Sequence, residues 1–214
     1  MEQKRIQPIR DDIKQQMAHI REPLFASKAS SQPGRYLNAC LHLTPEGWDT
    51  YAEGYRKAGD ILVEYIRDSK RDQDYLVYPI AFLYRQYLEL RLKELWRVSS
   101  AMLESGSDPL TGHDLMQLWH QVRPNIEQEW LGHDIKSDLS AIEERLEEIF
   151  SVDPVSQAFR YPEYRSGATT LPGMREINLG QLQTVMQAIS NILDGISYAI
   201  GEYLKWQHER KADR

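Results

Sequence analysis

The stretch from Tyr75 to Leu103 constrains the fold more than any other part of the chain, because its pattern predicts one long helix with a broad apolar surface. At about 100° per residue, the apolar side chains cover roughly 180–200° of the circumference. They are Leu76, Val77, Ile80, Leu83, Tyr84, Tyr87, Leu88, Leu90 and Leu95. Pro79 lies early, where a missing N–H is tolerated, so we expect the helix to begin near Asp74 or Tyr75. Such a helix must pack against neighbours on more than one side.

The charged side chains of this stretch divide into two groups by helical spacing. Arg91 projects into the apolar arc with Glu94 beside it. An unpaired buried charge is very costly, so Arg91 must reach solvent or pair with a carboxylate. On the opposite side Arg85, Glu89 and Lys93 are spaced four residues apart, which predicts a solvated ladder of ion pairs. We therefore expect Arg91 to be buried and paired, and Arg85 to contribute little to stability.

Length, hydropathy and charge predict the class of protein. A chain of 214 residues fits one domain, or one domain with an extension. No apolar run approaches the roughly 18 residues of a membrane span, and we expect no signal segment. The single Cys40 excludes an internal disulfide and suits a reducing cytoplasm. A net charge of −6 argues against nucleic-acid binding over the whole surface but permits a local basic site. These features predict a soluble cytoplasmic protein without a membrane segment.

Helical patterns on either side of the central stretch predict a bundle. Thr44-Pro45-Glu46 is typical of a helix start, and the short charged turn before the central helix predicts antiparallel packing. Three further helices are expected. The first begins at His113 or Asp114 and ends before Pro124, the second runs from Asp134 to Phe150, and the third runs from Asn178 to about Gln207. No alternating strand pattern is present. We predict an all-α fold: residues 1–43 form an arm and linker, and residues 44–208 form an antiparallel bundle of four main helices plus short ones.

Glycines in the last helix and wide apolar arcs on two helices indicate how the helices pack against neighbouring helices. Gly180, Gly195 and Gly201 in the last helix are expected to let another helix approach closely. The apolar arcs of the central and last helices are wider than one small bundle needs. We therefore expect a homodimer.

Histidines and acids near the third helix raise the question of a metal site. The residues concerned are His113, His120 and His133, with Asp114 and Asp134. His113 and His120 are seven residues apart, too far for the i, i+4 chelation of zinc helices. We expect His113 to cap its helix or bond a neighbouring loop, and Asp114 to complement the helix N-terminus. The sequence thus predicts no metal and no cofactor.

An irregular segment before the last helix gathers arginines and tyrosines. Its members are Arg160, Tyr161, Tyr164, Arg165 and Arg175. Such a cluster can hold a phosphate bidentately while an aromatic ring stacks on a base. The alternative is structural: Arg160 pairs with a core carboxylate such as Glu89, and Tyr161 packs under the loop. For Arg160 we favour the structural role.

Three motifs in order resemble the HEPN superfamily (higher eukaryotes and prokaryotes nucleotide-binding). They are YPIAFLYRQYLELRLKEL in the central helix, Gly112-His113-Asp114-Leu115 at the third helix, and Phe159-Arg160-Tyr161-Pro162 before the last. The resemblance covers roughly residues 44–207. It implies a dimeric bundle of four or five helices, in prokaryotic defence, toxin–antitoxin or RNA-processing systems.

The resemblance also implies a function and candidate residues. Active members resemble metal-independent ribonucleases that use Arg, four to six residues, then His. Here no His follows Arg160 before His208, and the one match, Arg35 to His42, precedes the core. We therefore predict binding of RNA or a nucleotide, or regulation of a partner protein. One alternative is a ribonuclease in which Arg160 or Arg85 acts with His113; another is a purely structural interaction module. The candidate ligand-binding residues are Arg85, Glu89, His113, Arg160, Tyr161 and Arg165.

Overall fold

The computed structural model describes residues 20, 24–25, 35–41, 47–103, 110–129 and 135–212. The chain divides into two compact units, Met1–Leu43 and Thr44–Arg214. In the first unit, the described residues include a short 3₁₀ helix, η1 (Arg35–Leu37), and the exposed Cys40. The expected helix start at Thr44-Pro45-Glu46 lies outside the described residues.

Five α-helices make up the described part of the second unit. They are α2 (Trp48–Ser69), α3 (Gln73–Met102), α4 (Leu115–Glu129), α5 (Lys136–Val152) and α6 (Leu179–Ala212). The described residues contain no strand, only an isolated bridge between Glu163 and Thr169, which confirms the all-α class. Within the described ranges, no helix combines the length and hydropathy needed to cross a membrane.

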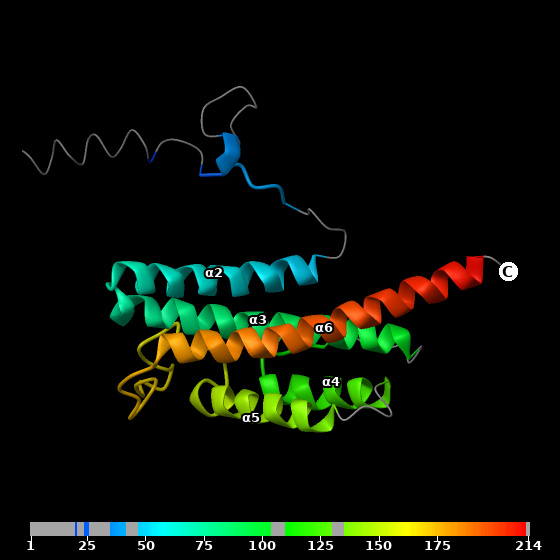
Figure 1. Cartoon of the computed structure of the whole chain (residues 1–214). Helices are drawn as coiled ribbons and strands as arrows, with labels where there is room; N and C mark the ends of the chain where they lie inside the picture. The colour runs from blue at the N-terminus through cyan, green and yellow to red at the C-terminus, as the bar shows by residue number, and fades with distance from the viewer. Residues whose placement is uncertain are drawn as a thin grey trace, which may run out of the picture. The chain divides into compact units, whose positions relative to one another are not determined.

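Helix α3 is the centre of this unit. It contacts α2, α4 and α6, and α5 packs on α4. Figure 1 shows α2 on one side of α3 and α4 and α5 on the other, with α6 running alongside α3. Buried apolar side chains fill the space between the helices: Ile80, Tyr84, Tyr87, Leu88, Leu92, Leu95, Leu118, Trp119, Val122, Ile126, Leu139, Ile142, Leu146, Met186, Ile189, Leu193 and Ile196. Because both sides of α3 are covered, the helix has little surface left for a polar face.

The helix starts follow the polar side chains that the sequence offers for capping. Asp114 Oδ1 accepts a hydrogen bond from the backbone N–H of Gln117 at 2.9 Å, as expected for the residue before α4. Asn178 Oδ1 accepts one from the N–H of Gln181 at 3.0 Å and caps α6 in the same way. The expected end of the third helix before Pro124 is wrong, since α4 continues to Glu129. Burial of Ile126 holds the turn after the proline in place.

Gly59 of α2 lies against the ring of Tyr84 of α3, with no space for a side chain. A Cβ at this position would lie 2.9 Å from Cε1 of Tyr84 and 3.1 Å from its Cζ. The ring cannot swing away, because Tyr84 is buried and its hydroxyl donates to Asp60 Oδ1 at 2.8 Å. Among the described residues, no atom lies within 4 Å of a Cβ placed at Gly195 or Gly201. A Cβ placed at Gly180 would meet Oδ1 of Asn178 at 3.4 Å, so within the described part of this chain no other helix approaches these three glycines of α6 closely.

A pair of glycine substitutions in α2 tests this contact. Alanine at exposed Gly54, where a Cβ meets nothing within 4 Å, should raise the free energy of unfolding by about 0.5–1 kcal/mol through helix propensity. Gly59→Ala gains the same propensity but overpacks the Tyr84 ring. The free energy of unfolding of Gly59→Ala, measured in urea, should be about 1–3 kcal/mol lower than that of Gly54→Ala. Equal stabilisation by both substitutions would show that the two helices are farther apart.

Candidate functional site

The guanidinium of Arg85 is the centre of a buried polar cluster. Arg85 is 1% exposed. Its Nη2 donates to the carbonyl oxygen of His113 at 2.7 Å, and its Nε donates to the carbonyl oxygen of Asp153 at 3.2 Å. Its Nη1 lies 3.4 Å from Glu89 Oε2, and its Nε lies 3.5 Å from Asp153 Oδ2. Burial lowers the pKa of Arg85, with nearby Arg160 adding to this, while Asp153 and Glu89 oppose the shift.

The expectation that Arg85, Glu89 and Lys93 form a solvated ladder is wrong. The i, i+4 pairs exist, but Arg85 and Glu89 are buried and Lys93 is half-buried. The residues that cover them belong to segments distant in sequence, His113 before α4 and Asp153 after α5. Helical spacing placed these charges on one face, and the packing of other segments then removed that face from water.

The carboxylate of Glu89 holds the imidazole of His113. Glu89 Oε1 lies 2.8 Å from Lys93 Nζ and 2.8 Å from His113 Nδ1. Burial favours the neutral acid, but hydrogen bonds from Lys93 and His113 outweigh it, so the pKa of Glu89 lies below its ordinary value. The stability that this shift contributes is present above the ordinary pKa and is lost as the pH falls through the lowered pKa. The His113 side chain is 70% exposed, so a buried acid orients a solvent-accessible imidazole.

Asp153 connects this cluster to the loop between α5 and α6. Its Oδ1 accepts hydrogen bonds from the backbone N–H groups of Gln157 at 2.7 Å and Ala158 at 3.0 Å. Asp153 is 1% exposed and directly follows α5. The Arg85 pair therefore fixes the turn that leads into Arg160 and Tyr161.

Arg160 lies at the surface, near two aromatic rings. Its Nε donates to the carbonyl oxygen of Ser156. Its guanidinium carbon lies 5.6 Å from the ring centre of Phe82 and 5.6 Å from that of Tyr161. The expected pairing with Glu89 is wrong, since Glu89 is occupied by Lys93, His113 and Arg85. Tyr161 is 54% exposed, so the expectation that it packs under the loop is also wrong.

A cavity of about 610 Å³ opens beside Arg160. It is lined by Tyr78, Phe159, Arg160, Tyr161, Pro162, Thr169, Thr170, Leu171 and Met174. Thr170 closes the loop, because its hydroxyl donates to the carbonyl oxygen of Tyr161 at 2.8 Å. Sequence reasoning missed Tyr78, although it lies one helical turn before Phe82 on α3. Arg165 is exposed and does not line this cavity.

The described residues contain no group of three or more His, Cys, Asp or Glu side chains that could hold a metal ion. His120, on α4, lies 3.5 Å from Glu143 through its Nε2. His133 and Asp134 lie outside the described residues.

The segments that buried Arg85 contacts carry two side chains that suit a chemical role, Arg160 and His113. One is the Arg160 guanidinium near two aromatic rings at the edge of a cavity, which suits a phosphate and a base. The other is an exposed imidazole oriented by a carboxylate, which suits proton transfer. No protein-family model, curated protein or solved structure matches this chain.

Proposed function

We propose that this protein is a HEPN-like helical protein that binds RNA or a nucleotide through the surface around Arg160, in a defence or toxin–antitoxin setting. One observation carries the proposal: the Arg160 guanidinium lies 5.6 Å from the ring centres of Phe82 and Tyr161 at the edge of the 610 Å³ cavity. With Nε bonded to Ser156, the guanidinium is fixed in direction, and its Nη groups remain suited to a phosphate.

The aromatic side chains at this cavity support the same class of ligand. Tyr78 is 49% exposed and Tyr161 is 54% exposed, so each presents a ring face on which a base can stack. The chain as a whole is acidic, with a net charge of −6, so binding rests on this local site. A few unstacked nucleotides fit such a site better than a long duplex.

Fluorescence anisotropy with a labelled single-stranded RNA of twelve nucleotides tests this proposal. Arg160→Ala and Tyr161→Ala should each weaken binding by about 5- to 150-fold, the range expected for loss of one stacked or bidentate contact. Arg210→Ala is the matched control, since α6 ends far from the loop that carries Arg160 (Figure 1). Binding that falls equally in all three variants, or in none, would contradict the site.

The contact between Glu89 and His113 favours a second candidate, a metal-independent ribonuclease. A buried carboxylate 2.8 Å from Nδ1 orients the imidazole as a general base for a ribose hydroxyl. The same RNA, incubated in EDTA and separated by size, distinguishes cleavage from binding. Under this candidate, cleavage is lost in His113→Gln and kept in His120→Gln, an exposed histidine of α4.

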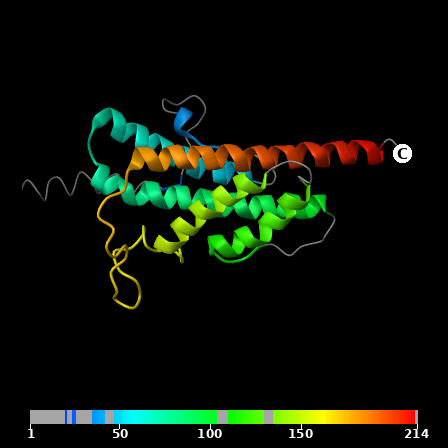
Figure 2. The ribbon, with the colours of Figure 1, turned by 60° about the horizontal axis from the view of Figure 1, so that its bottom comes forward.

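The homodimer stays a prediction. Three aromatic side chains in the last part of α6 support it: Tyr198 is 71% exposed, Tyr203 is 41% exposed and Trp206 is 49% exposed. Figure 2 shows this end of α6 extending past the neighbouring helices of the bundle. Regulation of a partner protein through the same surface is consistent with these side chains.

A further inference from the structure

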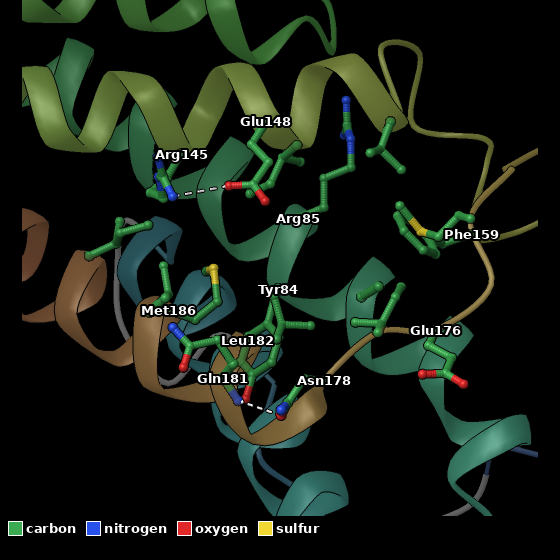
Figure 3. Close-up of a pocket in the computed structure, with 17 residues that line it drawn as sticks. Tyr84, Arg85, Arg145, Glu148, Phe159, Glu176, Asn178, Gln181, Leu182 and Met186 are labelled. Carbon is green, nitrogen blue, oxygen red and sulfur yellow. Dashed lines mark hydrogen bonds and ion pairs between the residues drawn. The ribbon is translucent and has the colours of Figure 1, made fainter. Parts of the chain in front are cut away.

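A second cavity, of about 490 Å³, lies between α3, α5, α6 and the loop before α6 (Figure 3). Its wall includes Phe159, Met174, Val185 and Met186, with Glu148 and Glu176 among its polar residues. Its volume is within the range of ordinary small-molecule sites. Most of the side chains that form its wall are apolar.

The polar groups deep in this cavity are engaged elsewhere. The hydroxyl of Tyr84 donates to Asp60 of α2, which takes it away from the cavity. The guanidinium of Arg85 is bonded to Glu89, His113 and Asp153. The interior therefore presents methyl, methylene and ring surface to whatever enters it. Protein interiors contain few voids larger than a water molecule, so a hollow of this size with apolar walls suits an apolar occupant.

The charges are at the rim, and carboxylates outnumber cations there. Arg145 is paired with Glu144 at 3.2 Å and with Glu148 at 3.3 Å. Figure 3 shows the Arg145–Glu148 pair on α5 above the cavity and Glu176 on the opposite side, in the loop. Gln181 adds a neutral amide at the start of α6. With Arg145 already shared by two acids, the rim carries a net negative charge.

We propose that this cavity binds a hydrophobic amine: a small molecule with a compact apolar body and a cationic nitrogen at its solvent end. The apolar body replaces water against Val185, Met186 and Phe159, and the ammonium lies at the rim near Glu148 and Glu176. Charge complementarity selects an amine over a carboxylic acid of the same shape. Met174 and Met186 adapt the wall to the shape of the ligand, because their side chains are unbranched and polarizable.

Three probes with one shared cage test the ligand class: 1-adamantylamine, 1-adamantanol and 1-adamantanecarboxylate. They are titrated into the full chain at neutral pH and low salt, with the methionine methyl groups labelled for NMR. The amine should shift the methyl signals of Met186, which lines this cavity but not the 610 Å³ cavity, and of Met174, which lines both, and leave those of Met102 and Met116 unmoved. The dissociation constant of the amine should be at least about fivefold lower than that of the carboxylate, with the value for the alcohol between them.

Two tryptophan substitutions on α6 test the location. Val185→Trp fills the cavity and should abolish the methyl shifts. Ala188→Trp places the same ring at an exposed position of the same helix and should leave them unchanged. Glu148→Gln combined with Glu176→Gln should remove most of the preference for the amine. If Val185→Trp fails to fold by circular dichroism, the methyl shifts of the unmodified chain still decide the question.

Three results would overturn this proposal. In the first, no probe shifts Met186, the methionine that lines this cavity but not the 610 Å³ cavity. In the second, the carboxylate binds best. In the third, a folded Val185→Trp variant binds the amine as the unmodified chain does.

Discussion

Replacing Arg85 with alanine is expected to lower the free energy of unfolding by about 3–5 kcal/mol, a large part of the stability of a domain. The reason is the charge that remains. Glu89 and Asp153 are 2% and 1% exposed, and without Arg85 both carboxylates lose a buried cationic partner. Urea unfolding followed by circular dichroism measures the effect.

Arg145→Ala on α5 is the matched control for Arg85→Ala. The Arg145 side chain is 45% exposed and pairs with neighbours on its own helix, so its loss should cost only about 0.3–0.5 kcal/mol. A second variant, Arg85→Met with Glu89→Gln, removes both charges and should recover part of the loss of Arg85→Ala. If Arg85→Ala lowers the free energy of unfolding no more than Arg145→Ala does, Arg85 is exposed in solution, which would contradict the buried position described above.

Arg91→Ala is expected to cost a similar amount, about 3–5 kcal/mol, for a separate reason on another side of α3. Arg91 is 5% exposed; its Nη1 lies 3.1 Å from Glu94 Oε2 and its Nε lies 2.9 Å from Asp194 Oδ1 of α6. Burial opposes the charged form, but Asp194 and Glu94 outweigh it and raise the pKa of Arg91. The burial and pairing expected from helical spacing are confirmed.

The partners of Arg91 explain why methionine should not rescue it. Glu94 is 6% exposed and also accepts a hydrogen bond from Ser197 of α6 at 2.7 Å. Asp194 is more exposed and accepts one from Tyr87 at 3.0 Å. Arg91→Met keeps the packing of the stem but leaves Glu94 without its cation. It should therefore cost nearly as much as Arg91→Ala in urea unfolding.

Adding Glu94→Gln to Arg91→Met should restore stability, because the stranded charge is then absent. A small loss in Arg91→Ala, below about 1 kcal/mol, would contradict the buried pair and indicate that Arg91 reaches solvent. An Arg91→Met variant as stable as the unmodified chain would indicate that packing of the stem, and not the charge, carries the effect.

The sequence alone determined the features that depend on neighbours along one helix. The pattern from Tyr75 to Leu103 predicted the central helix, which the structure gives as Gln73–Met102. Asp114 and Asn178 predicted two helix starts, because an N-cap bonds to backbone groups two or three residues away. The position of Arg91 among apolar residues required a partner, since the cost of an unpaired buried charge is independent of topology.

The candidate site depended on contacts that no local pattern contains. Helical spacing predicts the i, i+4 pair of Arg85 and Glu89, but the segments before α4 and after α5 contact Arg85 over separations of 28 and 68 residues. The same holds for Arg160, whose partners Phe82 and Tyr161 come from α3 and the loop.

Helical periodicity gives the direction of a side chain relative to its own helix axis. Arg85 and Arg91 are six residues apart, so they point about 120° away from each other around α3. Whether either direction meets water or protein depends on which other segments pack there. The long-range packing of α4, α6 and the loop buried both arginines. The sequence therefore determined which residues share a face of α3. The tertiary structure decided that the charged residues Arg85, Glu89, Arg91 and Glu94 on this helix are all buried.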